Sequence, residues 1–254
     1  MMQKWNIKPG WVTLIAIVVL MAIGAMVGFK AMEENQTNFI INIDDESGSE
    51  FINEWEVKEL INKLVKEDSS INHKEELNLK QLEQALNAID FVKEAQVSRD
   101  LRDNVIIDVY QETPLARVMA SSGKGGYVSV NRRILSLSDN YTARVMMITG
   151  AGADSLLTDN FWISEQGKAL FEFIEFVNKS EEWRAQISQI DLNSKLEIVA
   201  FPQIGRQRIE FGPLENYELK FKKLNVFYNE IVKKEGWNAY EVVKLQYDGQ
   251  IVCK

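Results

Sequence analysis

The sequence predicts an α+β protein that is tethered by one N-terminal transmembrane helix. Three observations support this prediction. An uncharged apolar run lies near the N-terminus, four later segments have apolar residues at helical spacing, and runs typical of β-strands lie between those segments. Of the 254 residues, 46% are hydrophobic and 26% are charged, so the chain can bury a substantial core.

The apolar run extends from Trp11 to Phe29 and contains 19 residues without a charge. As an α-helix it would be about 28 Å long, against a hydrocarbon core of roughly 30 Å. The run is too apolar on all sides to fit a buried core helix in a chain of this size. A cleaved signal peptide usually has an apolar region of only about 7–15 residues. We therefore expect a retained membrane helix over residues 11–29.

The charges beside this run predict its orientation. Lys4 and Lys8 precede it, whereas Lys30 is soon followed by Glu33 and Glu34. Positive charge tends to stay on the cytoplasmic side of a membrane. We expect a short cytoplasmic tail, a single pass through the inner (cytoplasmic) membrane, and the rest of the chain outside the cytoplasm.

The overall charge and the cysteine content exclude several classes of protein. The net charge of −8 and the pI near 5.0 argue against nucleic-acid binding, which needs an excess of Lys and Arg. Cys253 is the single cysteine, so no intrachain disulfide can form. We interpret it as a small apolar packing residue rather than a nucleophile.

The first folded unit is expected to have the order β-α-α-β-β. Strands are predicted at 39–43, 94–100 and 104–112, and amphipathic helices at 53–67 and 78–89. The inward faces of the two helices are expected to comprise Trp55, Leu60, Ile61, Leu64 and Val65 in the first, and Leu79, Leu82, Leu86 and Ile89 in the second.

The remaining chain predicts a second, mixed β-unit with helices. Helices are expected at 164–180 and at 219–236, where Gly236 is a C-cap. The inward face of the first helix is expected to comprise Ala169, Leu170, Phe173, Ile174 and Val177. That of the second is expected to comprise Leu224, Phe227, Tyr228, Ile231 and Val232. Hairpins and strands are expected at 126–139, 144–152, 183–192, 196–203, 206–212 and, around an Asp-Gly turn, 241–254.

No catalytic or metal-binding pattern emerges from the residues. The glycine-rich stretches 123–127 and 149–154 lack the G-x-G-x-x-G spacing of a phosphate-binding loop, and we interpret both as loops. His73 is the only histidine and lies among polar residues, without companions for a metal site or a catalytic triad. We therefore expect no active site, no cofactor and no small-molecule substrate.

The β-α-α-β-β order is the order of POTRA domains, and residues 82–118 resemble the FtsQ/DivIB family of bacterial division proteins. The residues that fit the family pattern are Val92, Ala95, Val97, Arg99, Ile107, Val109, Glu112, Pro114 and Ala116. Residues 243–252 are similar to the end of FtsQ β-domains. The chain departs from the family at Asp90-Phe91, where a proline often precedes the valine, in "VNRRIL", which lacks an Asp-x-x-Gly turn, and at Cys253, where many relatives carry tryptophan.

The resemblance implies a non-catalytic scaffold of the division septum. It implies a tail at 1–10, a transmembrane helix at 11–29, a linker at 30–38, a POTRA domain at 39–118 and an FtsQ-type β-domain at 119–254. The β-domain would bind FtsB, which accompanies FtsL, and the POTRA domain would contact upstream division proteins, with Phe39–Ile43 as a candidate edge. Two alternatives remain: a membrane-anchored extracytoplasmic enzyme and a POTRA-bearing translocation component.

The last hairpin contains the candidate partner-binding residues. In the resembled family a partner strand is added to this edge, and such β-augmentation combines backbone pairing with side-chain pockets. We expect residues 250–254 to offer about four or five backbone bonds, and we expect Tyr247 to be the aromatic anchor. The supporting residues are Val252, Ile251, Gln250 and Lys244. The alternative is that Val243, Leu245 and Tyr247 are simply core residues.

Overall fold

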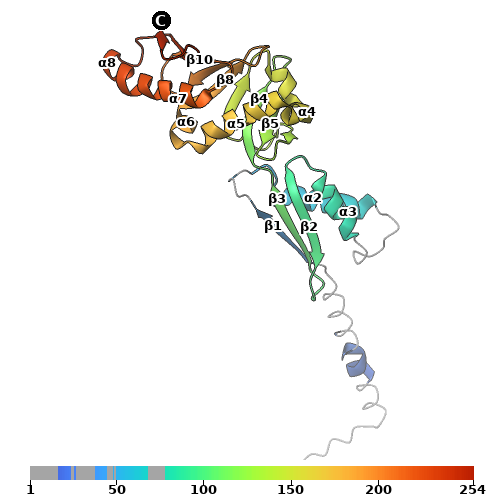
Figure 1. The fold of residues 1–254 in the computed structure, drawn as a ribbon. Coiled ribbons are helices and arrows are strands. Elements are labelled where there is room, and N and C mark those ends of the chain that lie inside the picture. The colour runs from blue at the N-terminus through green and yellow to red at the C-terminus, as the bar shows by residue number, and fades with distance from the viewer. Residues whose placement is uncertain (1–16, 24–25, 27–37, 45–47, 49, 68–77) are drawn as a thin grey trace, which may run out of the picture.

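The computed structural model describes residues 17–23, 26, 38–44, 48, 50–67 and 78–254. It contains a three-stranded and a nine-stranded sheet, so the predicted α+β class is confirmed. Figure 1 shows the two sheets one after the other along an elongated molecule, with the C-terminal hairpin at the end far from the first sheet.

The first unit has the predicted order of elements. Its central strand β3 pairs in parallel with β1 and antiparallel with β2. Helices α2 and α3 contribute buried residues to the core on one face of this sheet. The elements are β1 (Phe39–Asp44), α2 (Glu54–Glu67), α3 (Leu79–Asn87), β2 (Val92–Arg99) and β3 (Val105–Gln111).

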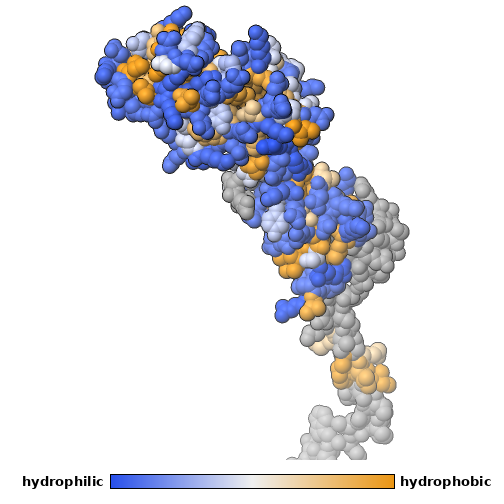
Figure 2. Space-filling view, in the orientation of Figure 1, coloured by the Kyte–Doolittle hydropathy of each residue, from blue (hydrophilic) through white to orange (hydrophobic). Residues whose placement is uncertain are grey.

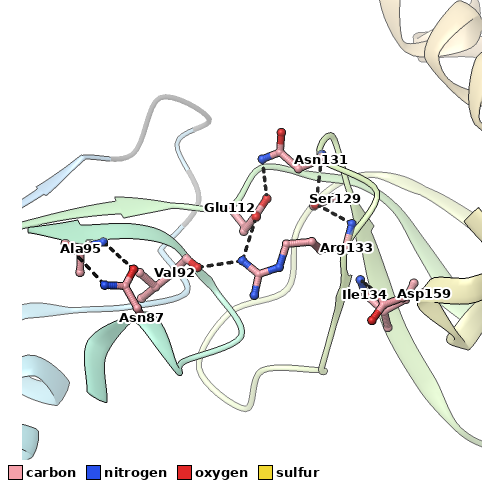
Figure 3. A network of polar contacts seen from close by, with 9 residues as sticks. All are labelled: Asn87, Val92, Ala95, Glu112, Ser129, Asn131, Arg133, Ile134 and Asp159. Carbon is pink, nitrogen blue, oxygen red and sulfur yellow. Dashed lines mark hydrogen bonds and ion pairs between the residues drawn. The ribbon is translucent and has the colours of Figure 1, made fainter. Parts of the chain in front are cut away.

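Local side-chain bonds explain where the two helices begin. Asn53 and Glu56 cap α2 reciprocally, since each side chain accepts a hydrogen bond from the other residue's backbone N–H at 3.0 Å. Asn78 caps α3 by accepting from the N–H of Gln81. At the other end of α3, Asn87 exchanges two hydrogen bonds with the backbone of Ala95, which fastens the helix to β2 (Figure 3).

The inward face of α2 differs from the prediction at one residue. Trp55 is 67% exposed, whereas Val57 is buried with 1% exposure. Ile61 is buried, and Leu60 and Leu64 pack against the same core, so the apolar stripe is real but begins at Val57. The side chain of Val65 lies outside the described residues. The large size of Trp55 made it look like a core residue, although the helix phase places it on the solvent side.

The second unit is built around the nine-stranded sheet, whose strand order is β12-β11-β10-β9-β8-β7-β4-β5-β6. Helices α5, α6 and α7 pack against one face of this sheet and form the larger core with it. The elements are β4 (Pro114–Met119), β5 (Gly125–Ser129), β6 (Ile134–Leu135), β7 (Met146–Thr149), a 3₁₀ turn η2 (Ala153–Leu157), α4 (Asp159–Ile163), α5 (Glu165–Lys179), α6 (Glu181–Gln186), β8 (Ile187–Leu192), β9 (Ile198–Pro202), β10 (Arg208–Gly212), α7 (Tyr217–Val226), a π-helical turn η3 (Phe227–Ile231), α8 (Val232–Glu235), β11 (Val242–Lys244) and β12 (Val252–Cys253).

Two parts of this unit differ from the extended runs predicted. Residues 183–186, predicted as extended, belong to helix α6, because the Ser180 hydroxyl accepts from the N–H of Trp183 and caps that helix. The strand β4 was not predicted as an element of its own. It pairs with both β5 and β7, so it lies inside the nine-stranded sheet. Residue 118, the proposed domain limit, falls within this strand.

The glycine-rich stretch 123–127 is only partly a loop. Gly123 has a φ of +85° in the turn, as a loop residue would. Gly126, however, belongs to β5, where an added Cβ would lie 2.8 Å from the carbonyl oxygen of Leu135. The glycine there permits close approach of two strands rather than a phosphate.

The first unit and the nine-stranded sheet share one apolar cluster. Phe51 stacks on Phe91 with ring centroids 4.5 Å apart, and it meets Tyr127 and Tyr141 of the second unit edge-on at 5.5 and 5.0 Å. Because Phe51 is only 2% exposed, its ring is a core residue for both units.

A buried carboxylate reinforces this junction, as Figure 3 shows. Glu112 is 1% exposed and lies between β3 and β4. Its carboxylate accepts from Arg133 at 3.1 Å and from Asn131 at 3.0 Å, both on the β5–β6 hairpin. Arg133 also donates to the carbonyl oxygen of Val92 at 3.0 Å, so its guanidinium bridges the two units.

The predicted membrane helix falls mostly outside the described residues. Residues 17–23 form helix and their large apolar side chains are exposed. Within the described part of the chain, no helix has both the length and the apolar character needed to span a membrane. His73 also lies outside the described residues.

We predict that Phe51→Ala lowers the free energy of unfolding by about 3–5 kcal/mol, because it removes a buried ring that packs against three other aromatic rings. The measurement is urea denaturation followed by tryptophan fluorescence. Trp55→Ala is the matched control, since it removes a larger but exposed ring and should change the free energy by no more than about 0.5 kcal/mol. Similar losses in the two variants would contradict the proposed role of Phe51.

Candidate partner-binding edge

The nine-stranded sheet ends on β12, whose second side is open in the described structure. β12 pairs antiparallel with β11, with Val243 opposite Cys253 and Lys244 opposite Val252. β11 in turn pairs in parallel with β10. The predicted closing hairpin is therefore confirmed, and its outer strand is only two residues long.

The hydrogen-bond pattern identifies the backbone groups that point outward. Val242 and Lys254 exchange two backbone bonds, of 2.9 and 3.1 Å. In an antiparallel ladder such bonded pairs alternate with pairs whose N–H and C=O groups point away. The groups of Cys253, and of Ile251 two residues earlier, therefore face the open edge. Together these two residues offer up to four backbone bonds to an added strand.

The structure separates the candidate side chains into core and surface. Val243 and Leu245 have no exposed area and belong to the larger core, as the alternative interpretation required. Tyr247, in contrast, is 42% exposed. In a continuing strand, Leu245 and Tyr247 would lie on the same face and share the same burial. The chain leaves the strand after Lys244, so Leu245 is buried while Tyr247 is accessible beside the edge strand.

The remaining candidates lie on both faces of the hairpin. Ile251 and Cys253 are half-buried and pack against the larger core. Burial raises the pKa of the Cys253 thiol, which keeps it protonated and agrees with a packing role. Val252 lies on the opposite face, across from Lys244, and Gln250 is exposed.

Lys244 has a structural partner on the next strand. Its ammonium lies 2.8 Å from the carboxylate of Glu210 on β10, and Arg208 lies 3.2 Å from the same carboxylate. The hydrogen bond with Lys244 is the largest cause of the lowered pKa of Glu210, and the same bond raises the pKa of Lys244. Lys244 therefore aligns β11 with β10 in addition to lying near the edge.

A lysine from α7 holds the turn of the hairpin. The ammonium of Lys223 donates to the carbonyl oxygen of Leu245 at 3.1 Å and also to that of Tyr247. No role for the lysines of this helix was predicted from the sequence. Nothing in their spacing indicates which of them reaches a backbone carbonyl 22 and 24 residues away.

A buried glutamine holds the chain just before β11. Gln207 is 1% exposed, and its amide nitrogen donates to the carbonyl oxygen of Trp237. An added Cβ on Gly205, whose φ is +101°, would lie 2.1 Å from the side-chain oxygen of Gln207. The glycine therefore leaves the space that this glutamine occupies, and the pair was not predicted from the sequence.

A pocket of about 600 Å³ adjoins the hairpin turn on its α7 side. Its lining includes Leu219, Lys222, Lys223, Val226, Gln246 and Asp248. Leu219 and Val226 are about half exposed, and Figure 2 shows such apolar residues scattered over a mostly hydrophilic surface in this half of the molecule. Within the described residues, no group of three or more His, Cys, Asp and Glu side chains is placed to hold a metal ion.

The fold and this edge together define a class: an α+β protein in which a β-α-α-β-β unit supports an open mixed sheet that ends on an accessible strand. Comparison with known families matches residues 113–254 to the family described as FtsQ/DivIB, C-terminal related. Because this match covers more than half of the chain, the protein belongs to the FtsQ/DivIB family, a non-catalytic family of cell-division proteins. No curated protein matches the chain.

The family match supports the family resemblance and covers residues 243–252, whereas residues 82–112 lie outside it. The resemblance was strongest at residues 82–118 and 243–252, whereas the matched region is continuous from residue 113 to residue 254. The match begins one residue before β4, the first strand of the nine-stranded sheet. The matched region therefore includes all nine strands of that sheet and the helices between them.

We predict that the contribution of the Glu210–Lys244 pair to stability is confined to a pH window. The lowered pKa of Glu210 means that its contribution is present above 4.5, its ordinary value, and is lost as the pH falls through the lowered one. The raised pKa of Lys244 means that its contribution is present below 10.5 and is lost as the pH rises through the raised value.

The measurement is the urea midpoint of wild type and Glu210→Gln across pH. The difference between the two should be constant inside this window and should shrink below pH 4.5. Glu230→Gln, which changes an exposed carboxylate on η3, should follow wild type at every pH. A difference that grew on acidification would contradict the assignment.

Proposed function

We propose that the protein is a non-catalytic divisome scaffold of the inner membrane. Residues 11–29 span the membrane once with residues 1–10 in the cytoplasm, and the linker 30–38 leads to a POTRA domain at 39–118 and an FtsQ-type β-domain at 119–254. Two observations support this arrangement: the family match over residues 113–254 and the β-α-α-β-β order of the first unit. The scaffold joins early and late division proteins at the septum.

The proposed partners at the β12 edge are FtsB and, with it, FtsL. The observation that supports this best is the open side of β12, where Ile251 and Cys253 direct their backbone groups outward. An FtsB segment adds there as a further strand. Its side chains alternate between the core side, next to Ile251, and the open face, next to Val252 and Lys244.

Backbone pairing at this edge is too weak to account for stable binding. Four bonds at about 0.5–1.5 kcal/mol each contribute roughly 2–6 kcal/mol, whereas micromolar affinity needs about 8 kcal/mol after ordering costs. Side chains beside the ladder supply the rest. Tyr247 is the proposed anchor because its ring is partly exposed in the unbound chain and can therefore be buried on binding. Gln250 adds a polar contact at the rim.

Membrane attachment of all partners lowers the affinity that the edge itself must provide. Confining the proteins to one membrane raises their effective concentration, so that a modest affinity in solution is sufficient.

The POTRA domain provides a second contact, to upstream division proteins. Its candidate edge is β1, which pairs with β3 on one side and has no second strand neighbour within the described residues.

We predict that Tyr247→Ala weakens binding of FtsB by at least about tenfold, because it removes the proposed aromatic anchor. The measurement is isothermal titration of the purified chain with an FtsB segment. Tyr110→Ala is the matched control, since Tyr110 is 39% exposed on the first sheet and lies far from β12 in the sheet arrangement. Wild-type affinity of the Tyr247 variant would exclude the anchor role.

We predict that a fluorescent fusion of the full chain collects at midcell in dividing cells. An even signal around the envelope would contradict the division role itself.

Extraction with alkaline carbonate tests the anchor separately: the full chain should stay with the membrane fraction, and a chain lacking residues 11–29 should be released.

A further inference from the structure

A second polar pocket lies away from the β12 edge. It has a volume of about 240 Å³ and is formed by the beginnings of β7 and β8, the end of α5, helix α6 and the residue after β9. Its polar lining comprises Arg144, Asn178, Arg184, Ser188 and Gln203, and Val177 is among its apolar residues.

The two arginines of this pocket have no partner within the described part of the chain. Most other arginines there are engaged, and the exposed Arg206 is an exception. Arg133 and Arg208 hold carboxylates, and Arg132 lies over the ring of Phe171 at 4.5 Å. Arg144 and Arg184, in contrast, make no ion pair and no ring contact, although both line the same pocket.

The lack of partners is not due to a shortage of carboxylates. The chain has 37 Asp and Glu residues against 29 Lys and Arg residues. On the neighbouring helix, Glu175 pairs with Lys179 at 3.0 Å, and Glu181 lies one turn before Arg184 without an ion pair between them. In a chain with a net charge of −8, these two guanidinium groups form a local site of the opposite sign.

The size and lining of the pocket select the kind of anion. Its volume is below the roughly 300–1,000 Å³ of sites for drug-sized ligands, so it accepts a single side chain rather than a cofactor. Guanidinium groups bind carboxylates through paired N–H donors, and Ser188 adds a hydroxyl group. The apolar lining residues, such as Val177 with 1% exposure, offer no hydrogen-bond donors, so a carboxylate fits better than a phosphate, which needs donors on all sides.

We propose that this pocket binds the carboxylate of an acidic residue, flanked by apolar residues, in a partner protein. The site is separate from the edge strand, because β9, β10 and β11 lie between β8 and β12 in the sheet. The proposal therefore does not depend on strand addition. Two separate contacts on one sheet would let a partner, or two partners, bind with higher combined affinity.

The test uses the full chain in detergent micelles at low ionic strength, with the tripeptide N-acetyl-Leu-Glu-Leu-amide as the probe. Titration is followed through the arginine side-chain N–H signals in ¹⁵N NMR. We expect saturable shifts for Arg144 and Arg184, and at least a tenfold loss of affinity in Arg144→Gln/Arg184→Gln. Arg144→Lys/Arg184→Lys keeps the charge and should bind with intermediate affinity, because the paired donors are lost.

The controls separate this site from general attraction of anions. Arg206→Gln changes another exposed arginine and should bind the peptide as wild type does. The peptide with Gln in place of Glu should not bind. No saturable shift, equal affinity in the double Gln variant, equal binding of the Gln peptide, or tighter binding of inorganic phosphate would each overturn the proposal.

Discussion

The arrangement of the whole molecule depends on the contacts at the junction of the two sheets. Phe51 arrives from the segment after β1 and packs against rings of both units. Glu112 follows β3 and accepts hydrogen bonds from the β5–β6 hairpin. A buried carboxylate is stable only while its partners remain, because an unpaired buried charge is costly. The polar contacts thus fix the geometry of the junction, and the aromatic contacts add buried apolar area to it.

Much of the fold followed from apolar periodicity, because most helices and strands have one buried face. The order of elements in the first unit and the inward faces of α3 and α5 were predictable on this basis. Trp55 and Val57 show the limit, since one residue of helix phase decides which of two apolar side chains is buried. Residues 183–186 show another. Their pattern suits a strand, but the Ser180 cap makes them helical.

The candidate edge was predictable in position but not in detail. An Asp-Gly turn between apolar runs indicates a hairpin, and the exposure of Tyr247 agrees with the interpretation of its ring as a surface residue. The contacts that hold the hairpin were not predictable. Lys223 and Gln207 reach backbone carbonyls far along the chain, and a single sequence without its fold contains no sign of such pairs. The arginines of the second pocket were missed for the same reason.

The shortness of β12 reconciles two opposing requirements. A long, flat, open strand would pair with any extended chain, whereas natural proteins keep such edges short or charged. Two residues of ladder, with Lys244 and Glu210 on the adjoining face, limit indiscriminate pairing. Under the proposed strand addition, a partner must supply side chains that fit the neighbouring surface. The weak backbone contribution would then make binding depend on those side chains, which gives specificity.

The connection between β3 and β4 has a mechanical consequence. Only Glu112 and Thr113 separate the two strands, and the junction clamps the first of these residues from the side. A force applied to the N-terminal end of the chain would therefore be transmitted from one sheet to the other through this short connection, which is too short to extend. A load at that end would move the two sheets together, because only two residues connect β3 to β4.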